Sequence, residues 1–326
     1  MPRRVLVVGG AGYIGSHMVK LLCQRGCEVT VLDDLSAGYR DAVVGGQLVE
    51  GDLGDLALLE RVFQDRRPEG VLHFASHIQV GESVREPARY YRNNVFKTQG
   101  LLDALVAHQV RGFIFSSTAA IFGEPLQSPI DETHPKNPIN PYGRSKWMVE
   151  QMLRDYDVAY GLKSVCLRYF NAAGADPDGE LGERHEPETH LIPLVLRVAA
   201  GRQPSITVFG IDYDTPDGTC IRDYIHVTDL CEAHWLALQQ LWVGGASAAY
   251  NLGNGNGFSV REVIEAAHAV TGRVIPVQYG PRRPGDPARL VADARRVQAE
   301  LGWAPRYADL ATLIGHAWRW ETRQTA

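Results

Sequence analysis

Residues 4–15 read RVLVVGGAGYIG, a short β-branched run that breaks into glycines. Gly9, Gly12 and Gly15 follow this run directly and open an amphipathic stretch that begins near Tyr13. Glycine permits a tight turn and lets a phosphate approach the backbone closely, while the first turn of a helix offers it unpaired N–H groups. The pattern therefore predicts a strand, a turn and a helix that bind the pyrophosphate of a dinucleotide.

The same alternation continues through the first half of the chain. Amphipathic stretches that begin near Tyr13, Asp55, Pro87 and Asn140 separate apolar runs at 4–9, 28–33, 47–52, 70–75, 112–117 and 163–170. Continuous apolar strands divided by helices indicate a parallel sheet that helices cover on both faces. We therefore predict an α/β fold with a doubly wound parallel sheet of the Rossmann type.

After about Asn171 the pattern changes, and residues 174–190 are dense in Gly, Pro and acidic side chains. We expect a helix at 191–200, a strand at 206–210 and a return to the sheet at 224–252. This organisation predicts a smaller, mixed α/β C-terminal domain built from two separated segments. The predicted domain limits are 1–171 with 224–252 for the dinucleotide-binding domain, and 172–223 with 253–326 for the substrate domain.

Composition excludes several classes of protein. With 45% apolar residues and a net charge of -5, the chain is typical of globular proteins and shows no basic patch for nucleic acid. The apolar start lacks a cleavage site, and no apolar run has the length of a membrane span, so a cytoplasmic protein is expected. Neither the eleven histidines nor the five cysteines show metal-site spacing, and no metal is predicted.

Acidic residues at the ends of two expected strands indicate which dinucleotide binds. Asp33 ends the second strand, where it can accept hydrogen bonds from the adenosine ribose hydroxyls. A carboxylate there would repel a 2′-phosphate, so NAD is favoured over NADP. Asp52, after the third strand, is a candidate partner for the adenine amine. The alternative for Asp33 and Asp34 is a pair of solvated loop carboxylates.

The segment NPYGRSK sets Tyr142 and Lys146 four residues apart, so a helix stacks an ammonium one turn from a phenol. The ammonium and the positive nicotinamide ring would both favour the phenolate and lower the tyrosine pKa from about 10. The strand that ends FIFSST could deliver Ser116, Ser117 or Thr118 to the same cleft. The combination predicts alcohol oxidation, whereas the alternative is an amphipathic helix surface.

Segments along nearly the whole chain resemble the UDP-glucose 4-epimerases (UDP-galactose 4-epimerases) of the extended short-chain dehydrogenase/reductase superfamily. In order they are GGAGYIGSH, VLDDLS, EGDL, LHFASHIQVGESV, YYRNNV, FIFSSTAAIFG, PYGRSK, LRYFNAAGA, FGIDYDTPDGTCIRDYIHVTDL, YNLGNGNGFSV and GPRRPGD. The stretch FGIDYDTPDGTCIRDYIHV is the most specific of these.

The resemblance implies an isomerase of galactose metabolism that inverts C4 of a UDP-hexose, with or without an N-acetyl group, through a transient 4-keto sugar. Tyr142 would take the proton of the 4-hydroxyl, Thr118 would relay it, and Lys146 would hold the nicotinamide ribose and tune Tyr142. Because each turnover regenerates NAD, the cofactor need never leave.

The resemblance also implies binding residues. Arg222 and Arg283 would bind the substrate pyrophosphate, Asn171 would donate to the diphosphate sugar, and Asp286 would accept from the uridine ribose. Without the resemblance these residues could equally form surface ion pairs or a turn cap. The implied cofactor-binding residues are Gly9, Gly12, Tyr13, Ile14, Gly15, Asp33, Asp52, Leu53, Phe74, Ala75, Asn94, Lys146, Tyr169 and Phe170. The implied substrate-binding residues are Thr118, Tyr142, Asn171, His190, Leu191, Arg222, Arg283, Asp286 and Leu290.

Three positions depart from the family pattern or vary within it. Ile78 replaces a lysine that many members place near the nicotinamide, and His190 stands where many have asparagine. Leu290 occupies a position whose bulk admits or refuses an N-acetylated sugar, and leucine is intermediate. The preference among sugars therefore stays open.

Other functions remain as alternatives. A 4-epimerase of a UDP-pentose or UDP-uronate would share the same three catalytic residues, and a non-catalytic dinucleotide-sensing protein would share the fold. A 4,6-dehydratase is disfavoured, because its Thr-Asp-Glu is replaced by Thr118, Ala119 and Ala120. The resemblance further implies a homodimer joined through helices near 87–108 and 140–160, with Met148 and Met152 against the partner chain.

Overall fold

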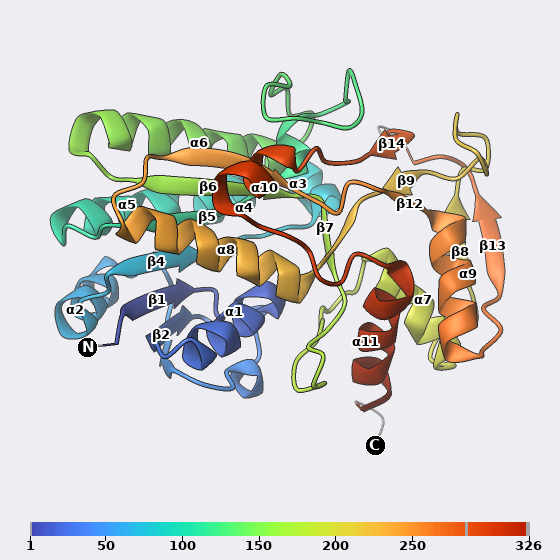
Figure 1. The fold of residues 1–326 in the computed structure, drawn as a ribbon, viewed down its shortest axis with the longest axis horizontal. Helices are drawn as coiled ribbons and strands as arrows, with labels where there is room; N and C mark the ends of the chain where they lie inside the picture. The colour runs from blue at the N-terminus through green and yellow to red at the C-terminus, as the bar shows by residue number, and fades with distance from the viewer. Residues whose placement is uncertain (1, 284–285, 324–326) are drawn as a thin grey trace.

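The six apolar runs of the first half, together with one later strand, form a seven-stranded sheet in which every pair of neighbours is parallel. The computed structural model describes residues 2–283 and 286–323 (Figure 1). The strand order is β11-β6-β5-β4-β1-β2-β3. The strands are β1 (Arg4–Val8), β2 (Glu28–Asp33), β3 (Gln47–Glu50), β4 (Gly70–His73), β5 (Phe113–Thr118), β6 (Ser164–Tyr169) and β11 (Ala248–Leu252). The predicted doubly wound α/β fold is confirmed.

Helices cover both faces of this sheet, and the strands are apolar on both sides for that reason. Val5 and Val7 of β1 point into one core, whereas Leu6 and Val8 point into the other. The first core lies under α1 (Tyr13–Gln24) and α8 (Val227–Trp242). The second lies under α2 (Leu56–Arg66), α5 (Thr98–Ala107) and α6 (Pro141–Tyr160).

The helix expected from Pro87 is divided into three consecutive segments. The α-helix α4 (Pro87–Tyr91) passes into a π-helical turn, η2 (Arg92–Lys97), before α5 begins. The π turn buries Asn94, whose amide bonds to the loop after β4. Short helices α3 (Val80–Arg85), η1 (Arg40–Ala42) and η3 (Ala119–Ile121) complete this half.

Apart from α8, β11 and α10 (Arg295–Leu301), which pack on or join the large sheet, the described part of the chain after β6 forms a second body of helices and small sheets (Figure 1). Its core lies between α7 (Leu191–Ala199), α9 (Val260–Thr271) and α11 (Leu310–Arg323). The sheets pair β7 (Asn171–Ala173) with β10 (Tyr224–His226), β8 (Ile206–Phe209) with β13 (Val277–Gly280), and β9 (Ile221–Arg222) with both β12 (Phe258–Ser259) and β14 (Arg289–Leu290). The short helix α10 packs on α8.

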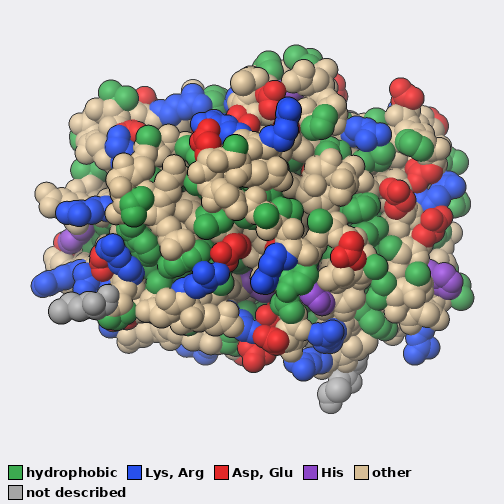
Figure 2. Space-filling model, viewed as in Figure 1, with side chains coloured by type: hydrophobic (Ala, Val, Ile, Leu, Met, Phe, Trp, Pro, Cys, Tyr) green, Lys and Arg blue, Asp and Glu red, His purple; other side chains and the backbone are tan. Residues whose placement is uncertain are grey.

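Of the predicted return at 224–252, β10 pairs with β7 outside the large sheet, whereas α8 packs on that sheet and β11 joins it beside β6. The predicted domain limits stay a prediction. Within residues 2–283 and 286–323, no helix combines the length and the hydropathy that crossing a membrane requires. Figure 2 shows acidic and basic side chains interspersed over one face of the molecule.

Candidate active site

The glycine turn after β1 has two glycines that packing requires and one that it does not. A Cβ on Gly9, whose φ is 82°, would lie 2.4 Å from the Ala75 nitrogen, and one on Gly15 would lie 2.1 Å from the Gly9 oxygen. A Cβ on Gly12 would meet only the Gly9 oxygen, at 3.6 Å. Gly12 is also the N-cap of α1, and its helix end has no side-chain cap. This open, uncapped helix end suits the pyrophosphate of a dinucleotide.

Two predicted cofactor residues beside this turn direct their side chains inward. The Tyr13 hydroxyl donates to the Gly174 carbonyl at 2.7 Å, and Ile14 packs against the core under α1 and α8. Their contribution to an anion site is therefore confined to the backbone N–H groups of the first helical turn.

Asp33 is held against the glycine turn. Its Oδ2 accepts from the Ala11 N–H and its Oδ1 from the Leu35 N–H, each at 2.9 Å. Burial raises the pKa of this carboxyl, and the two N–H groups offset part of the rise. Because a carboxylate oxygen accepts more than one hydrogen bond, Asp33 can still bind ribose hydroxyls.

Asp52 follows β3, the edge strand next to β2. Its carboxylate accepts from the Lys97 ammonium at 2.7 Å and from the Gly54 N–H at 2.6 Å. The Lys97 hydrogen bond lowers the pKa of Asp52. The next predicted residue, Leu53, is buried in the core under α2, α5 and α6.

The predicted residues after β4 form a loop that Asn94 fastens to α6. The Asn94 amide accepts from the His77 N–H at 2.9 Å, and donates to the His77 carbonyl at 3.0 Å and to the Ser145 hydroxyl at 3.1 Å. Asn94 therefore positions the loop that carries Phe74 and Ala75. The departure at Ile78 lies exposed in the same loop.

The three candidate hydroxyls at the end of β5 have different surroundings. Ser117 donates to the Glu150 carboxylate at 2.6 Å, and the Ser116 hydroxyl lies 3.4 Å from Nε2 of His234. The ring of His234 packs between Phe74 and the predicted residue Tyr169. Thr118, the last residue of β5, accepts from the Ala120 N–H at 3.1 Å and contacts the Tyr142 hydroxyl. Of the three, Thr118 is the hydroxyl placed beside the tyrosine.

Tyr142 and Lys146 lie in the first two turns of α6. Asn140 caps this helix by accepting from the Gly143 N–H at 2.8 Å, and Pro141 occupies its first position. The Lys146 ammonium donates to the Ser76 hydroxyl at 2.7 Å and to the Ser116 carbonyl at 2.8 Å. Lys146 thus links α6 to the carboxyl ends of β4 and β5.

Burial acts on the pKa values of both Tyr142 and Lys146. Burial raises the pKa of the phenol, and the hydrogen bond with Thr118 offsets part of the rise. Burial also lowers the pKa of Lys146 to about 7. The Lys146 ammonium is engaged with Ser76 and Ser116, and the lowering of the Tyr142 pKa by Lys146 and the positive nicotinamide ring stays a prediction.

The predicted substrate residues gather around β9, β14 and the start of β7. Asn171 donates to the Asp223 carbonyl at 3.0 Å, and Arg222 lies opposite Leu290 where β9 pairs with β14. Arg222 forms an ion pair with Asp286. The family resemblance implies that these two residues bind different parts of a substrate, whereas here they bind each other. The guanidinium has five N–H donors, so some remain for a phosphate.

Two further residues predicted to bind substrate, Arg283 and Leu290, contact aromatic or apolar side chains. The Arg283 guanidinium stacks over the Phe209 ring at 4.1 Å. Leu290 packs with Phe170 and Trp147 on a small cluster that includes Ile121. This cluster adjoins Thr118 through η3, so Leu290 and the predicted cofactor residue Phe170 share one apolar wall.

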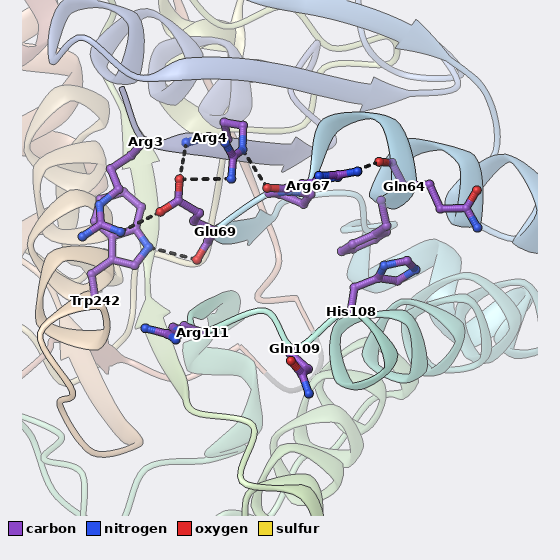
Figure 3. A pocket seen from close by; sticks show the side chains of 11 residues that line it. Arg3, Arg4, Gln64, Arg67, Glu69, His108, Gln109, Arg111 and Trp242 are labelled. Carbon is purple, nitrogen blue, oxygen red and sulfur yellow. Dashed lines mark hydrogen bonds and ion pairs between the residues drawn. The ribbon is translucent and has the colours of Figure 1, made fainter. Parts of the chain in front are cut away.

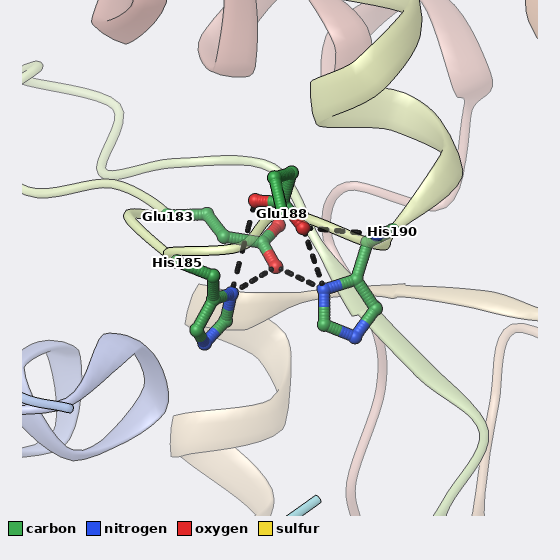
Figure 4. A group of neighbouring side chains, drawn as sticks. All are labelled: Glu183, His185, Glu188 and His190. Carbon is green, nitrogen blue, oxygen red and sulfur yellow. Dashed lines mark hydrogen bonds and ion pairs between the residues drawn. The ribbon is translucent and has the colours of Figure 1, made fainter. Parts of the chain in front are cut away.

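His190 lies at the N-cap of α7, directly before Leu191, and faces carboxylates (Figure 4). Its Nδ1 is 2.7 Å from Glu183 and 3.1 Å from Glu188. Burial opposes the charged imidazole, but the two carboxylates outweigh burial and raise the pKa of His190 to about 10. Glu183, Glu188 and His185 were not singled out in the sequence. Their pattern, E-x-H-x-x-E-x-H across 183–190, could have indicated the cluster.

A cavity of about 770 Å³ lies elsewhere, at the amino ends of β1 and β4 (Figure 3). Ligands of doubly wound sheets bind outside the carboxyl ends of the strands. This cavity is therefore on the wrong side of the sheet for the predicted chemistry. Its lining residues are Arg3, Arg4, Phe63, Gln64, Arg67, Pro68, Glu69, His108, Gln109, Arg111 and Trp242.

The sequence matches a known protein family over most of its length. Residues 5–253 match the family described as the NAD dependent epimerase/dehydratase family. The chain belongs to the NAD dependent epimerase/dehydratase family. It is 52% identical, over 316 residues, to the UDP-glucose 4-epimerase of Halalkalibacterium halodurans, covering 97% of this chain and 95% of the relative.

Solved structures of this family agree over nearly the full length. The UDP-glucose 4-epimerase of Brucella ovis in complex with NAD is 53% identical, with a TM-score of 0.95 and 97% of each chain covered. The enzyme of Bifidobacterium longum in complex with NAD+ and UDP is 40% identical, with a TM-score of 0.93 and 98% of each chain covered. NAD is the cofactor of this chain, and the open helix end at Gly12 with the adjacent Asp33 fits it.

Proposed function

We infer that this protein is an isomerase that carries out NAD-dependent 4-epimerisation of a UDP-hexose through a transient 4-keto sugar. One observation carries the inference. Thr118, Tyr142 and Lys146 converge at the carboxyl ends of the strands, on the side of the sheet where the glycine turn opens. The family membership and the identity to UDP-glucose 4-epimerases support the same reaction.

The chain's own residues handle the cofactor and one proton. When bound, NAD supplies reversible acceptance of a hydride from a carbinol carbon, and its positive ring favours a nearby phenolate. We propose that the uncapped turn at Gly12 holds its pyrophosphate and that Asp33 binds its adenosine ribose. Lys146 would exchange a bond with Ser76 or Ser116 for one to the nicotinamide ribose.

Tyr142 acts as base and then as acid in this proposal. Its phenolate takes the proton from the 4-hydroxyl as C4 becomes a carbonyl, and Thr118 hydrogen-bonds the same oxygen. After the 4-keto sugar presents its other face, the phenol returns the proton to O4. The proton and the hydride both go back to the sugar, so the reaction is redox-neutral and consumes no external reductant.

We propose that Arg222 and Arg283 neutralise the diphosphate of the substrate, with Asn171 at the sugar end. Arginine suits this task because its planar fork binds phosphate oxygens in pairs. Asp286 already bonds to Arg222, so substrate binding would require the guanidinium to divide its N–H groups between carboxylate and phosphate. Leu191 and His190 would line the substrate site at the start of α7, and Leu290 would line the part of that site that holds the hexose.

A homodimer is proposed through the surface formed by α3, η2 and α6. Val84 and Phe96 are 62% and 70% exposed there, and Val80 and Met148 are also exposed. Met152 packs against the core under α6, so Met148 is the better candidate for a partner contact. Light scattering after gel filtration would show a monomer in a Phe96→Asp variant if this surface joins the dimer. A dimer that persists in this variant would place the interface elsewhere.

The domain limits and the compartment also stand as proposals. We propose that residues 1–171 and 224–252 form the NAD-binding domain and that the other two segments bind the UDP-sugar. All five cysteines are free thiols, which supports a reducing compartment such as the cytoplasm.

The reaction is tested by incubating purified protein with UDP-galactose, without added NAD, and measuring UDP-glucose. Tyr142→Phe should lower kcat by about 10²-fold or more, as expected for loss of a general base. Tyr160→Phe is the matched control, because Tyr160 lies exposed at the far end of the same helix. It should retain wild-type activity. Near-full activity of Tyr142→Phe would refute the role of Tyr142.

Absence of conversion even with added NAD would refute the proposed hexose reaction. UDP-N-acetylgalactosamine, UDP-arabinose and UDP-galacturonate, assayed in parallel, would identify a preferred sugar of another kind. If none of these sugars is converted, a dinucleotide-sensing protein becomes the better explanation.

A further inference from the structure

Four side chains between β7 and α7 direct their ligand atoms at one another (Figure 4). They are Glu183, His185, Glu188 and His190, and their nearest nitrogen and oxygen atoms all lie within 4.8 Å of one another. We propose that these four residues form a binding site for one divalent transition-metal ion of the zinc class. This proposal does not rest on the proposed epimerase reaction.

The distances suit a tetrahedral shell. Nδ1 of His190 lies 2.7 Å from Glu183 Oε1 and 3.1 Å from Glu188 Oε1. Nδ1 of His185 lies 3.0 Å from Glu183 Oε1 and 3.8 Å from Glu188 Oε2. Ligand bonds of about 2.1 Å in a tetrahedral zinc site place neighbouring ligand atoms about 3.4 Å apart. The observed separations fall on both sides of that value, so small side-chain rotations would complete the shell.

Burial and charge favour a cation at this point. The Glu188 side chain is 1% exposed and the Glu183 side chain 6% exposed. The backbone N–H groups of Thr189 and His190 donate to Glu188 Oε1, and positive charge between the two buried carboxylates would offset the repulsion that solvent cannot screen. A divalent ion supplies two positive charges through the same four atoms. The competing arrangement is a network of imidazolium–carboxylate pairs without an ion.

The donor set selects the class of metal. Two imidazole nitrogens with two carboxylate oxygens suit Zn²⁺, Co²⁺ or Ni²⁺, whereas Mg²⁺ and Ca²⁺ prefer an all-oxygen shell. Four protein ligands also close a tetrahedral shell, which is typical of structural rather than catalytic zinc.

The location indicates what the ion would hold in place. His185 packs edge-on against the ring of Tyr13 in the first turn of α1, with ring centroids 6.3 Å apart. His190 is the N-cap of α7. An ion bound here would therefore fix the 183–190 segment between the helix of the glycine turn and the helix that begins at Leu191. In Figure 4 the Nδ1 atoms of both histidines face the carboxylates, and both Nε2 atoms point away.

The test is direct metal binding by the NAD-bound protein. The purified protein is treated with a chelator, desalted and titrated with Co²⁺, then with Zn²⁺ by calorimetry. We expect one equivalent of each metal per chain, and visible Co²⁺ absorption bands of tetrahedral intensity. Glu188→Gln should weaken Zn²⁺ binding by about tenfold or more. Glu186→Gln is the matched control, because Glu186 is exposed and outside the cluster.

The possible results separate clearly. Saturable binding that Glu188→Gln weakens and Glu186→Gln preserves supports the site. If the wild-type protein takes up no Co²⁺ or Zn²⁺, or if both variants bind as tightly as wild type, the ion-free pair network is correct and the proposal is overturned. His185→Ala gives a second ligand variant if Glu188→Gln does not fold. Failure of metal binding would leave the UDP-galactose assay unaffected, so the two proposals are judged separately.

Discussion

Removing Glu150 should destabilise this protein far more than removing a carboxylate from its surface. Glu150 lies in α6, one turn beyond Lys146, and accepts from Arg168 of β6 at 2.9 and 2.6 Å. It also accepts from Ser117 of β5 at 2.6 Å. The side chains of Arg168 and Glu150 are only 2% and 1% exposed. The pair therefore fastens the helix that carries the tyrosine and lysine to the two strands beneath it.

The loss in free energy of unfolding depends on whether a variant leaves a buried charge without its partner. Glu150→Ala leaves the buried guanidinium of Arg168 without a carboxylate partner, which costs about 3–5 kcal/mol. That is a large share of a total stability of about 5–15 kcal/mol. The double variant Glu150→Leu, Arg168→Met removes both charges, so it should be more stable than Glu150→Ala and lose only the bond that Ser117 donates to Glu150. Urea unfolding followed by circular dichroism measures each free energy of unfolding.

A surface pair provides the control. Glu232 accepts from Arg25 at 2.9 and 3.0 Å, but these side chains are 33% and 44% exposed, so solvent screens the pair. Glu232→Ala should therefore cost no more than about 1 kcal/mol. The reasoning is refuted if Glu150→Ala costs no more than this control. It is also refuted if the double variant is as unstable as Glu150→Ala, since the stranded charge would then not be the cause.

Three further predictions concern the site. Gly12→Ala should leave thermal stability within a few degrees of wild type but release NAD, measured by absorbance after gel filtration. Gly15→Ala should instead destabilise the fold. Retained NAD in Gly12→Ala would contradict the role of Gly12. Lys146 has a folded pKa of about 7 against an unfolded value of about 10.4, so the folded state binds fewer protons between these values. The free energy of unfolding of NAD-free wild type should therefore rise, relative to Lys146→Met, from about pH 7 to about pH 10, and a difference independent of pH would refute the shift. Leu290→Ala should raise the rate with UDP-N-acetylgalactosamine relative to UDP-galactose, and an unchanged ratio would show that Leu290 does not limit sugar size.

Much of the fold could be predicted because its signals are local. The boundaries of the six strands of the first half all lie within two residues of the predicted ones, since parallel strands buried on both faces appear as continuous apolar runs. The glycine turn was equally visible. The π turn at 92–97 was not, because it depends on the bond between Asn94 and the loop after β4, which is distant in sequence.

The candidate site was less predictable. Spacing alone placed Tyr142 and Lys146 on one helix face, but it could not show that burial would raise the tyrosine pKa and lower that of the lysine. Nor could it choose among the three hydroxyls at the end of β5. Desolvation depends on the elements packed around a group, and those elements come from separate parts of the chain.

The sequence by itself determined the doubly wound sheet, the dinucleotide turn and the tyrosine–lysine pair. Each depends on a periodicity or a spacing within a few residues. Only the tertiary structure decided that Arg222 and Asp286 bind each other and that Glu150 fastens α6 to β5 and β6. These contacts join residues separated by many positions, and their energies depend on burial, which chain order alone does not specify.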